Sequence, residues 1–276
     1  MSVSTHSVTS YAETANFKSL RRSAVVRAGT YLYEGQHLVT GWHRHDVHQI
    51  EYAVGGVVDV ETSTSHFLLP PQQAVFIPAG LHHQATMNSN VRSIAVMFDP
   101  ELVQYDGTDA AVLDVSPLIR EMIVHAQRWP IGRLSNEVRA ERFFQALGDL
   151  VVEAVGLAHP MFSLPTSKHS VVSEAMTYTR ENLETVSAAR VSRAVAVSER
   201  TLRRLFREET GSSWRTYLLH ARMLKAMALL ATPTQSVQET AHTVGFRNVS
   251  SFARAFVEYC GTSPSEYRKH SAAQTF

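Results

Sequence analysis

The chain has 276 residues, of which 44% are hydrophobic and 18% are charged, and its formal net charge at pH 7 is +1. This length allows two domains with separate cores, and the composition excludes collagen-like chains, disulfide scaffolds and wholesale disorder. The single cysteine, Cys260, cannot form an intrachain disulfide, which fits a reducing compartment. No apolar run approaches the roughly 18 residues of a membrane helix, and the N-terminus lacks an apolar signal core, so we expect a cytoplasmic protein.

Charge divides the chain into two unlike halves. Residues 1–165 carry 11 basic and 16 acidic side chains, whereas residues 166–276 carry 15 basic and 9 acidic side chains. A basic C-terminal half beside an acidic N-terminal half indicates that the C-terminal half meets a polyanion.

The first predicted structured region is a set of short β-strands. Residues 1–23 are expected to be poorly ordered. From about residue 24 to residue 100, short runs rich in Val, Ile, Thr and Tyr alternate with Gly and Pro. Short strands at close spacing with turn residues between them predict a small β-barrel or sandwich.

Two amphipathic helices are predicted within residues 101–157. Their apolar side chains recur at helical spacing and are Leu118, Met122, Ile123 and Ala126, then Phe143, Phe144, Leu147, Leu150, Val151 and Ala154. These stripes need a packing partner, which the barrel of the same chain can supply.

A domain boundary is predicted at residues 158–168. This stretch holds two prolines and small polar residues, as linkers do. Residues 169–270 are predicted to be helical throughout, and residues 271–276 form a short tail.

The helical part contains an internal repeat with an offset of 50 residues. The matched pairs are Leu202–Phe206 with Phe252–Phe256, Glu208 with Glu258, Gly211 with Gly261, Ser213 with Ser263, and Tyr217 with Tyr267. Before each copy stands a short helix, a small turn residue (Ala196 or Gly245) and a helix-capping residue (Ser198 in the first copy, Asn248 or Ser250 in the second). The pattern predicts two helix-turn-helix units joined by a long helix of about residues 213–231.

Periodicity separates an inner and an outer face on the second helix of each unit. The inner residues are Leu202, Leu205 and Phe206 in the first copy, and Phe252, Ala255 and Phe256 in the second. The outer residues are Arg200, Arg203, Arg204 and Arg207, and then Asn248, Ser250, Ser251 and Arg254. Arginine offers a rigid donor fork that matches guanine or a phosphate. A solvated basic face on a helix bundle is the alternative, but two repeats with matched turns and caps favour DNA binding.

This segment resembles the DNA-binding domain of AraC/XylS-type transcriptional regulators. The residues that carry the resemblance are Ser198–Phe206 and Glu209–Ser213, followed by Val244–Phe246, Ser250–Phe256 and Gly261–Arg268. The resemblance implies a transcription factor that places two recognition helices in adjacent major grooves. It also implies that the helices between residues 115 and 157 build a homodimer, in addition to any packing on their own barrel.

The resemblance assigns roles to individual side chains. It implies that Arg200, Arg203 and Arg204 read bases in the first unit, and that Ser250, Ser251 and Arg254 do so in the second. Phosphate or structural contacts are implied for Arg207, Arg215, Arg222 and Lys225. Arg204 and Arg254 occupy equivalent positions, and one of them can instead pair with a carboxylate of its own domain.

Two positions depart from the family pattern. Ala196 stands where a turn glycine is commoner, and Val257-Glu258 lacks the usual basic residue after Phe256. The second departure weakens phosphate contacts near that helix, so the first repeat is expected to supply more of the affinity.

A histidine cluster marks the N-terminal part, where seven of the 14 histidines lie between residues 37 and 83. On an unbroken strand His43, His45, Gln49 and Glu51 share one face, whereas His48 points the other way. A His-x-His strand that meets His83 from a neighbouring strand is a candidate divalent metal site, because imidazole suits iron, nickel, copper and zinc.

These residues resemble the two motifs of the cupin barrel. The first motif fits His43 and His45, and the second, Pro-x-Gly-x-x-His, fits Pro78, Gly80 and His83. Gln49 stands where the acidic ligand is usual, and Glu51 follows two residues later. Three interpretations therefore stay open. One is a metal held by His43, His45, Glu51 and His83, and another is a metal-free effector pocket lined by Trp42, His43, His45, Gln49, Glu51 and His83. In the third, the histidines have purely structural roles.

The combined prediction is an α+β two-domain protein. It has a cupin-like sensor barrel (24–100), a helical dimerisation segment (101–157), a linker (158–168) and an all-α DNA-binding domain (169–270) with two helix-turn-helix units. The predicted function is sequence-specific regulation of transcription in response to a small molecule or metal ion, without enzymatic activity. Predicted partners are double-stranded promoter DNA, an effector, a second copy of the chain and RNA polymerase. The alternative is a metal-dependent cupin enzyme, a dioxygenase or isomerase, that carries a DNA-binding tail.

Overall fold

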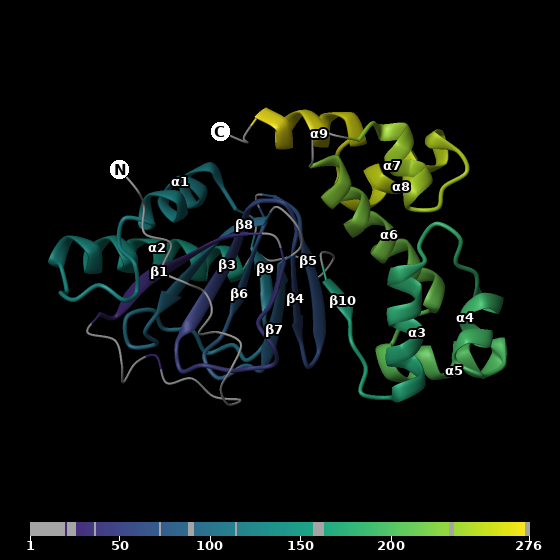
Figure 1. Cartoon of the computed structure of the whole chain (residues 1–276), viewed down its shortest axis with the longest axis horizontal. Coiled ribbons are helices and arrows are strands. Elements are labelled where there is room, and N and C mark those ends of the chain that lie inside the picture. Colours follow the sequence, from purple (N-terminus) through teal and green to yellow (C-terminus); the bar gives the residue numbers. More distant parts are fainter. Residues whose placement is uncertain are drawn as a thin grey trace. The chain divides into compact units, whose positions relative to one another are not determined.

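The computed structural model describes residues 20, 26–35, 37–71, 73–87, 91–113, 115–156, 163–231 and 235–273. The chain forms two compact units, residues 1–61 with 72–158 and residues 62–71 with 159–276 (Figure 1). The expected disorder of residues 1–23 lies outside the described residues, except for Leu20, and so do residues 274–276 of the expected tail. Among the described residues, no helix combines the length and apolar character needed to cross a membrane.

Antiparallel strands dominate the N-terminal part. They are β1 (Ala28–Gly35), β2 (Leu38–Val39), β3 (His48–Gly55), β4 (Val58–Thr62), β5 (Ser65–Leu69), β6 (Ala74–Ile77), β7 (His83–Met87), β8 (Val91–Phe98), β9 (Ala111–Leu113) and β10 (Ser163–Pro165). One five-stranded sheet has the order β1-β8-β3-β6-β9 and the other the order β10-β5-β4-β7-β2. The predicted strand-rich region is therefore present.

Alternation along β3 places its side chains on two different faces. Ile50 and Tyr52 are buried in a core that also holds Phe76 and residues of two helices. Because successive strand residues point to opposite faces, Gln49 and Glu51 face away from that core. The strand thus separates an apolar helix-covered face from a polar face.

The two helices that cover this sheet are α1 (Pro117–Ala126) and α2 (Val138–Gly156). Ile123 and Ala126 are buried on α1 as the spacing predicts, and Phe144, Leu147 and Val151 are buried on α2. The prediction was wrong for Leu118, which is 58% exposed, because Ile119 takes its place in the core. Pro117 starts the helix one residue after the capping Ser116, and that start sets which face turns inward.

Seven helices follow in the described residues of the C-terminal part. They are α3 (Ser170–Glu181), α4 (Ala188–Ala194), α5 (Glu199–Thr210), α6 (Trp214–Leu230), α7 (Val237–Thr243), α8 (Val249–Cys260) and α9 (Pro264–Ala273). The predicted long helix of residues 213–231 is α6 with its caps Ser213 and Ala231. The predicted linker is in part a strand, since Leu164 of β10 is buried and β10 pairs with β5.

The sequence repeat has a structural counterpart in α5 and α8. Each has 12 residues and ends at a left-handed glycine, Gly211 or Gly261. Ser198 caps the first by accepting from the Thr201 amide, and Asn248 caps the second. Equivalent aromatic pairs anchor both helices: the ring centroids of Phe206 and Tyr217 lie 5.4 Å apart, and those of Phe256 and Tyr267 lie 5.6 Å apart.

The two turns that precede α5 and α8 differ in their key residue. Gly245 has a φ of 85°, and Ala196 has a φ of 53°, the one positive φ of a non-glycine residue among those described. A left-handed conformation is unfavourable for an L-residue with a Cβ, by roughly 1–2 kcal/mol. The first turn is therefore strained where the second is not.

We expect Ala196→Gly to raise the free energy of unfolding by about 1 kcal/mol, because glycine adopts the left-handed conformation without a steric penalty. Urea unfolding followed by the helical circular-dichroism signal measures this. Gly245→Ala is the matched control and should lower the stability, because its Cβ would meet the carbonyl oxygens of Leu183 and Glu184. Equal or lower stability of Ala196→Gly would contradict the assignment of strain.

Candidate functional site

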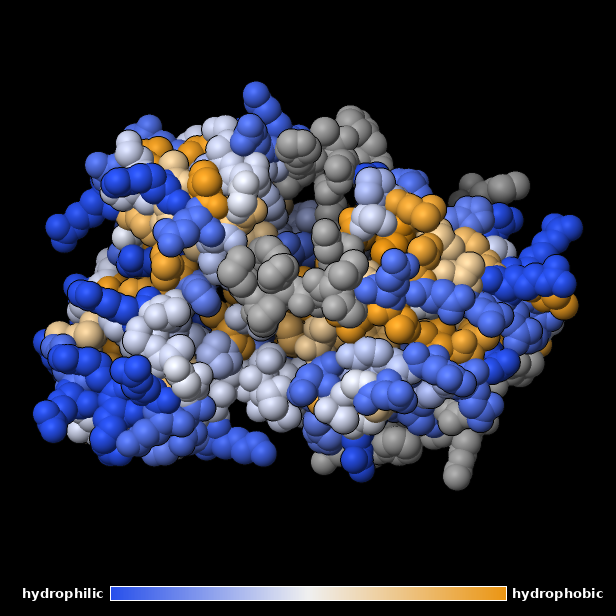
Figure 2. All heavy atoms as spheres, turned by 180° about the vertical axis from the view of Figure 1, so that it is seen from behind, coloured by the Kyte–Doolittle hydropathy of each residue, from blue (hydrophilic) through white to orange (hydrophobic). Residues whose placement is uncertain are grey.

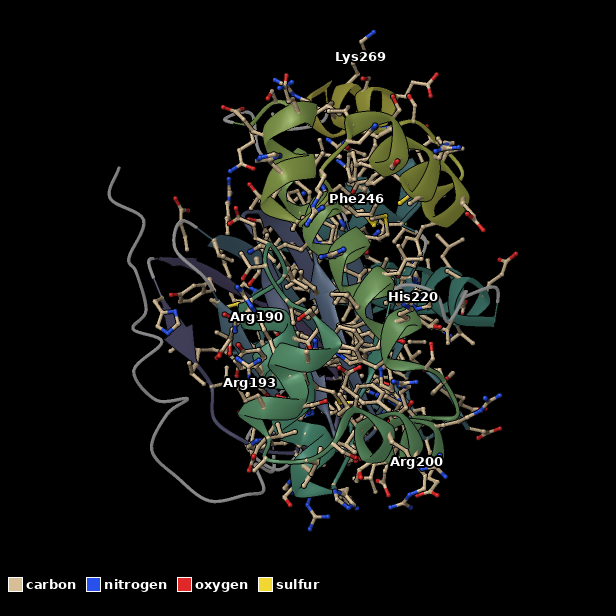
Figure 3. All side chains as sticks on the ribbon, turned by 90° about the vertical axis from the view of Figure 1, so that its right-hand side faces the viewer. Arg190, Arg193, Arg200, His220, Phe246 and Lys269 are labelled. Carbon is tan, nitrogen blue, oxygen red and sulfur yellow. The ribbon has the colours of Figure 1, made fainter. Side chains whose placement is uncertain are left out.

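An exposed row of arginines lies on α5. Arg200, Arg203, Arg204 and Arg207 are all exposed, whereas Leu202 and Phe206 on the opposite face are 1% and 0% exposed. Hydrophilic side chains gather over this part of the molecule, at the lower left of Figure 2. Arg200 belongs to the first turn of α5, and Figure 3 shows it at the outer end of that helix.

Two of these arginines pair with carboxylates of their own helix. Arg204 Nη1 lies 2.6 Å from Glu208, and Arg203 Nη2 lies 3.5 Å from Glu199. The expected alternative pairing of Arg204 with a carboxylate is thus present. Exposed pairs of this kind contribute about 0–1 kcal/mol, so both guanidinium groups can exchange their partner for another anion at little cost.

The equivalent face of α8 is less basic. Ser250 and Arg254 are exposed and Ser251 is half-buried. Asn248 Oδ1 accepts hydrogen bonds from the Ser250 and Ser251 amides at 2.8 and 3.1 Å. Asn248, one of the residues predicted to contact DNA, therefore uses its side-chain oxygen to cap the helix. Only its side-chain amide N–H group remains available for a contact with DNA.

Arg222 has a structural position. Its Nη2 donates to the Leu183 carbonyl at 2.9 Å, and its guanidinium lies 5.6 Å from the centroid of the Phe246 ring. Burial lowers the pKa of Arg222. Of the two roles left open by the sequence, phosphate contact and structure, the contacts favour structure for this residue, whereas Arg215 and Lys225 are exposed.

The sequence interpretation missed a pair of basic residues on α4. Arg190 and Arg193 are exposed and lie close together in Figure 3. They border a shallow hollow with Tyr178 and Ala194. In DNA-bound helix-turn-helix units the first helix crosses the phosphate backbone, and α4 is the helix before the turn at Ala196. The position of both arginines on the short helix before Ala196 is the signal that could have identified them.

Three histidines converge in the N-terminal part. His43 and His83 form an isolated antiparallel bridge, and one ring nitrogen of each of His43, His45 and His83 lies within 4.8 Å of the others. All three side chains are buried. The strand expected to run through His43 and Glu51 is interrupted, because β3 begins only at His48.

Backbone carbonyls fix the orientation of the three rings. His43 Nδ1 lies 2.9 Å from the Gly41 carbonyl oxygen, His45 Nδ1 lies 2.8 Å from that of Val47, and His83 Nδ1 lies 2.9 Å from that of Leu81. Since a carbonyl only accepts, His43 and His83 donate from Nδ1. His45 faces a second acceptor, because Gln49 Oε1 lies 2.8 Å from its Nε2, so a neutral His45 ring has one proton for two acceptors. Outer hydrogen bonds of this kind orient imidazole ligands on metals.

The charge state of the rings also suits a cation. Burial lowers the pKa of His83 to about 3 and lowers that of His45, so both are neutral at physiological pH. His83 Nε2 is buried and has no hydrogen-bond partner. A cluster of three imidazoles fits a borderline divalent metal such as zinc, nickel, copper or iron.

Gln49 and Glu51 lie beside this cluster. Gln49 Oε1, an acceptor, lies 2.8 Å from His45 Nε2, and Gln49 Nε2 donates to Glu51 Oε2 at 3.0 Å. Glu51 is therefore outside the three-histidine group, with Gln49 between it and His45. Burial raises the pKa of Glu51 to about 7, despite the hydrogen bond from Gln49. Trp42 is 42% exposed and His48 is buried, where its Nδ1 accepts from the Ala79 amide.

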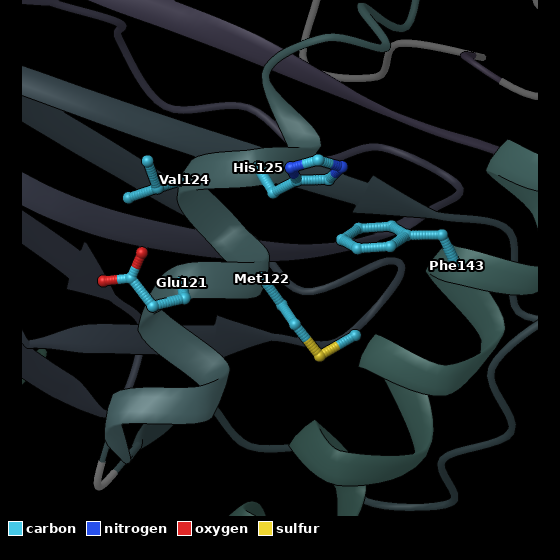
Figure 4. A pocket seen from close by; sticks show the side chains of 5 residues that line it. All are labelled: Glu121, Met122, Val124, His125 and Phe143. Carbon is cyan, nitrogen blue, oxygen red and sulfur yellow. The ribbon is translucent and has the colours of Figure 1, made fainter.

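A groove between α1 and α2 is a further candidate site. It is bordered by Glu121, Met122, Val124, His125 and Phe143. In Figure 4, Met122 and His125 point toward α2 and Phe143 points toward α1. The rings of His125 and Phe143 lie 5.5 Å apart. Both helices thus offer a partly apolar surface outside their core.

Both parts of the chain match known families. Residues 28–154 match the AraC-like ligand binding domain, and residues 191–270 match a helix-turn-helix domain. The HTH-type transcriptional regulator NimR of Escherichia coli K12 is 28% identical over 244 residues, which cover 88% of this chain and 85% of NimR. A putative AraC-like transcription regulator of Streptomyces antibioticus is 26% identical over 223 residues, 79% of this chain and 64% of that protein. The Msm operon regulatory protein of Streptococcus mutans is 35% identical over 79 residues, 29% of this chain and 28% of that protein.

We expect Glu51 to make stability fall as pH rises. Its pKa of about 7 exceeds the unfolded value of 4.5, so the native state binds more protons between these values. Below pH 4.5 the stabilisation is complete, and it is lost as pH rises through 7. Relative to Glu51→Gln, the wild type should lose up to about 3 kcal/mol of unfolding free energy across this window. Urea unfolding at several pH values, with a chelator present, measures this, and parallel pH profiles would contradict it.

We expect chelator-treated, untagged protein to gain thermal stability when Zn²⁺ or Ni²⁺ is added. At 100-fold excess over the dissociation constant, the gain is about 2.7 kcal/mol. His83→Ala should lose the metal-dependent gain, because the cluster falls to two imidazoles. His37→Ala, at an exposed histidine, is the control that should retain it. A gain that is equal in wild type and His83→Ala would place the metal elsewhere.

Proposed function

The chain belongs to the AraC family of transcriptional regulators, and we propose that it binds promoter DNA through two helix-turn-helix units, α4–α5 and α7–α8. The observation that carries this proposal is the repeat of a 12-residue helix with the same C-terminal glycine and the same aromatic anchor. In such units the second helix enters the major groove, so α5 and α8 are the recognition helices. Residues 169–270 are proposed as the DNA-binding domain.

In this proposal, the four arginines of α5 supply most of the affinity. Arg200, Arg203 and Arg204 read base edges, and Arg207 contacts a phosphate together with Arg190 and Arg193 of α4. On α8, Ser250, Ser251 and Arg254 read bases and Asn248 adds its amide N–H group. Arginine predominates on α5, which suits guanine, because the guanidinium fork matches O6 and N7 of that base.

The N-terminal unit is proposed as a cupin-like sensor, with residues 24–100 as its barrel. The three-histidine cluster is its candidate site, and the effector is a divalent metal or a small molecule that meets these imidazoles. Metal binding at His45 must displace Gln49 from its Nε2. An effector regulates transcription only if it binds one arrangement of the two DNA-binding units better than the other.

A metalloenzyme is the second candidate function, because a cluster of three imidazoles can hold a catalytic iron. Stoichiometric iron in untagged protein, together with substrate turnover, would support it. The relatives are named as regulators, which favours sensing without catalysis.

We further propose that residues 101–157 form a homodimer contact. Leu118 and Val124 on α1 are 58% and 38% exposed, and they accompany the groove of Met122 and Phe143. Burial of this apolar surface against a second copy would stabilise a dimer by about 25 cal/mol per Å² before the cost of association. RNA polymerase remains a proposed partner of the DNA-bound form.

We expect Arg200→Ala to weaken binding to the selected operator by about 1–3 kcal/mol and to relax the preference at one base position. Selection from a random duplex pool followed by sequencing identifies the operator, and titration measures the affinity. Arg92→Ala, at a half-exposed arginine of β8, is the control and should change neither. Uniform weakening on all sequences, with the salt slope lower by about one, would instead make Arg200 a phosphate contact.

A further inference from the structure

The two recognition helices differ along one row of positions outside the core, all exposed except the half-buried Ala253. At an offset of 50 residues, the row Glu199, Arg203 and Arg207 of α5 corresponds to Val249, Ala253 and Val257 of α8. These positions are four residues apart, so each row runs along one side of its helix. A charged row on the first helix is therefore an apolar row on the second.

The neighbouring row retains its polar character. Arg200, Arg204 and Glu208 of α5 correspond to Ser250, Arg254 and Glu258 of α8. Since α5 and α8 have the same length, the same C-terminal glycine and the same aromatic anchor, equivalent positions face the same way within their units. In this row, α8 therefore has the same polar character as α5. In the adjacent row, α8 is apolar where α5 is charged.

The apolar row is not part of the protein core. Val249 and Val257 are 40% and 45% exposed, whereas Phe252 and Phe256 on the inner face are fully buried. Ala253, Arg254, Val257 and Glu258 border a shallow hollow on the helix surface. Packing within the described part of the chain therefore does not account for the two valines.

We propose that Val249, Ala253 and Val257 read thymine methyl groups in the major groove, so that α8 prefers a thymine-containing half-site and α5 a guanine-containing one. The proposal rests on the proposed function of α8 as a recognition helix. Thymine is the base that presents a methyl group in this groove, and small apolar side chains contact it. Arg254 in the adjacent row keeps the surface close to DNA.

The occupant of this row is DNA and not a protein partner because of its place in the repeat. Its three positions are those of Glu199, Arg203 and Arg207 on α5, two of which hold arginines assigned to DNA. A methyl group transferred from water to an apolar contact contributes about 0.8 kcal/mol, which is about a fourfold change in affinity.

The test uses the full chain and duplexes selected from a random pool. The half-site of α8 is the one whose base preference relaxes in Arg254→Ala. Each thymine in that half-site is then replaced by deoxyuridine, which lacks only the methyl group. We expect wild type to bind the deoxyuridine duplex about threefold to fourfold more weakly for each methyl contacted. Deoxyuridine in the half-site of α5 should have no comparable effect.

A double variant carries Val249→Ser and Val257→Ser together. The control variant is Val138→Ser. Val138 is a 63% exposed valine at the start of α2. The double variant should bind thymine and deoxyuridine duplexes alike, and the control should still distinguish them.

Three results would overturn the proposal: an α8 half-site without thymine, wild-type binding that ignores deoxyuridine, or a methyl effect that persists in the double variant. None of these three results would contradict the proposed function, because the chain would still select a specific DNA sequence. Absence of any selected sequence would overturn both.

Discussion

The proposed DNA-facing surface depends on one repeated contact, the packing of a buried phenylalanine on a tyrosine. Phe206 meets Tyr217 and Phe256 meets Tyr267, with ring centroids 5.4 and 5.6 Å apart. Each pair fixes the rotation of its recognition helix about its own axis, because the aromatic face must stay in the shared core. The arginines of α5 and the valines of α8 are exposed as a consequence. A rotation of either helix would bury charge and expose two aromatic rings, at a cost of several kcal/mol.

The two units share this aromatic packing but differ in their turns and in the exposed residues of α5 and α8. The α4–α5 unit keeps a strained Ala196 at its turn but carries a full set of basic side chains on and before its recognition helix. The α7–α8 unit has the unstrained Gly245 and a capping box at Ser236, together with an apolar row on α8. Electrostatic attraction to phosphates is independent of sequence, whereas contacts with base edges and methyl groups specify it. If both units bind DNA as proposed, the first supplies most of the affinity and the second most of the discrimination between sequences.

In the N-terminal unit, backbone carbonyls rather than carboxylates orient the imidazoles. The carbonyl oxygens of Gly41, Val47 and Leu81 each contact one Nδ1, and one ring nitrogen of each histidine lies within 4.8 Å of the others in a buried position. Gln49 joins this cluster to Glu51, whose pKa of about 7 leaves it close to half-ionised at neutral pH. A cation at the histidines would compete with Gln49 for His45, so binding there reorganises the polar face of β3.

The sequence by itself determined the family, the division into a strand-rich and a helical part, the repeat and the outward arginines, because periodicity and repeat offset are local properties. It could not decide that Ile119 and not Leu118 enters the core, that residues 163–165 form a strand, or that β3 begins after His45. Those outcomes depend on helix starts and strand pairing between distant residues. The grouping of His43, His45 and His83 without Glu51, and the structural position of Arg222, were likewise settled only by tertiary contacts, since donor geometry exists only once separate segments meet.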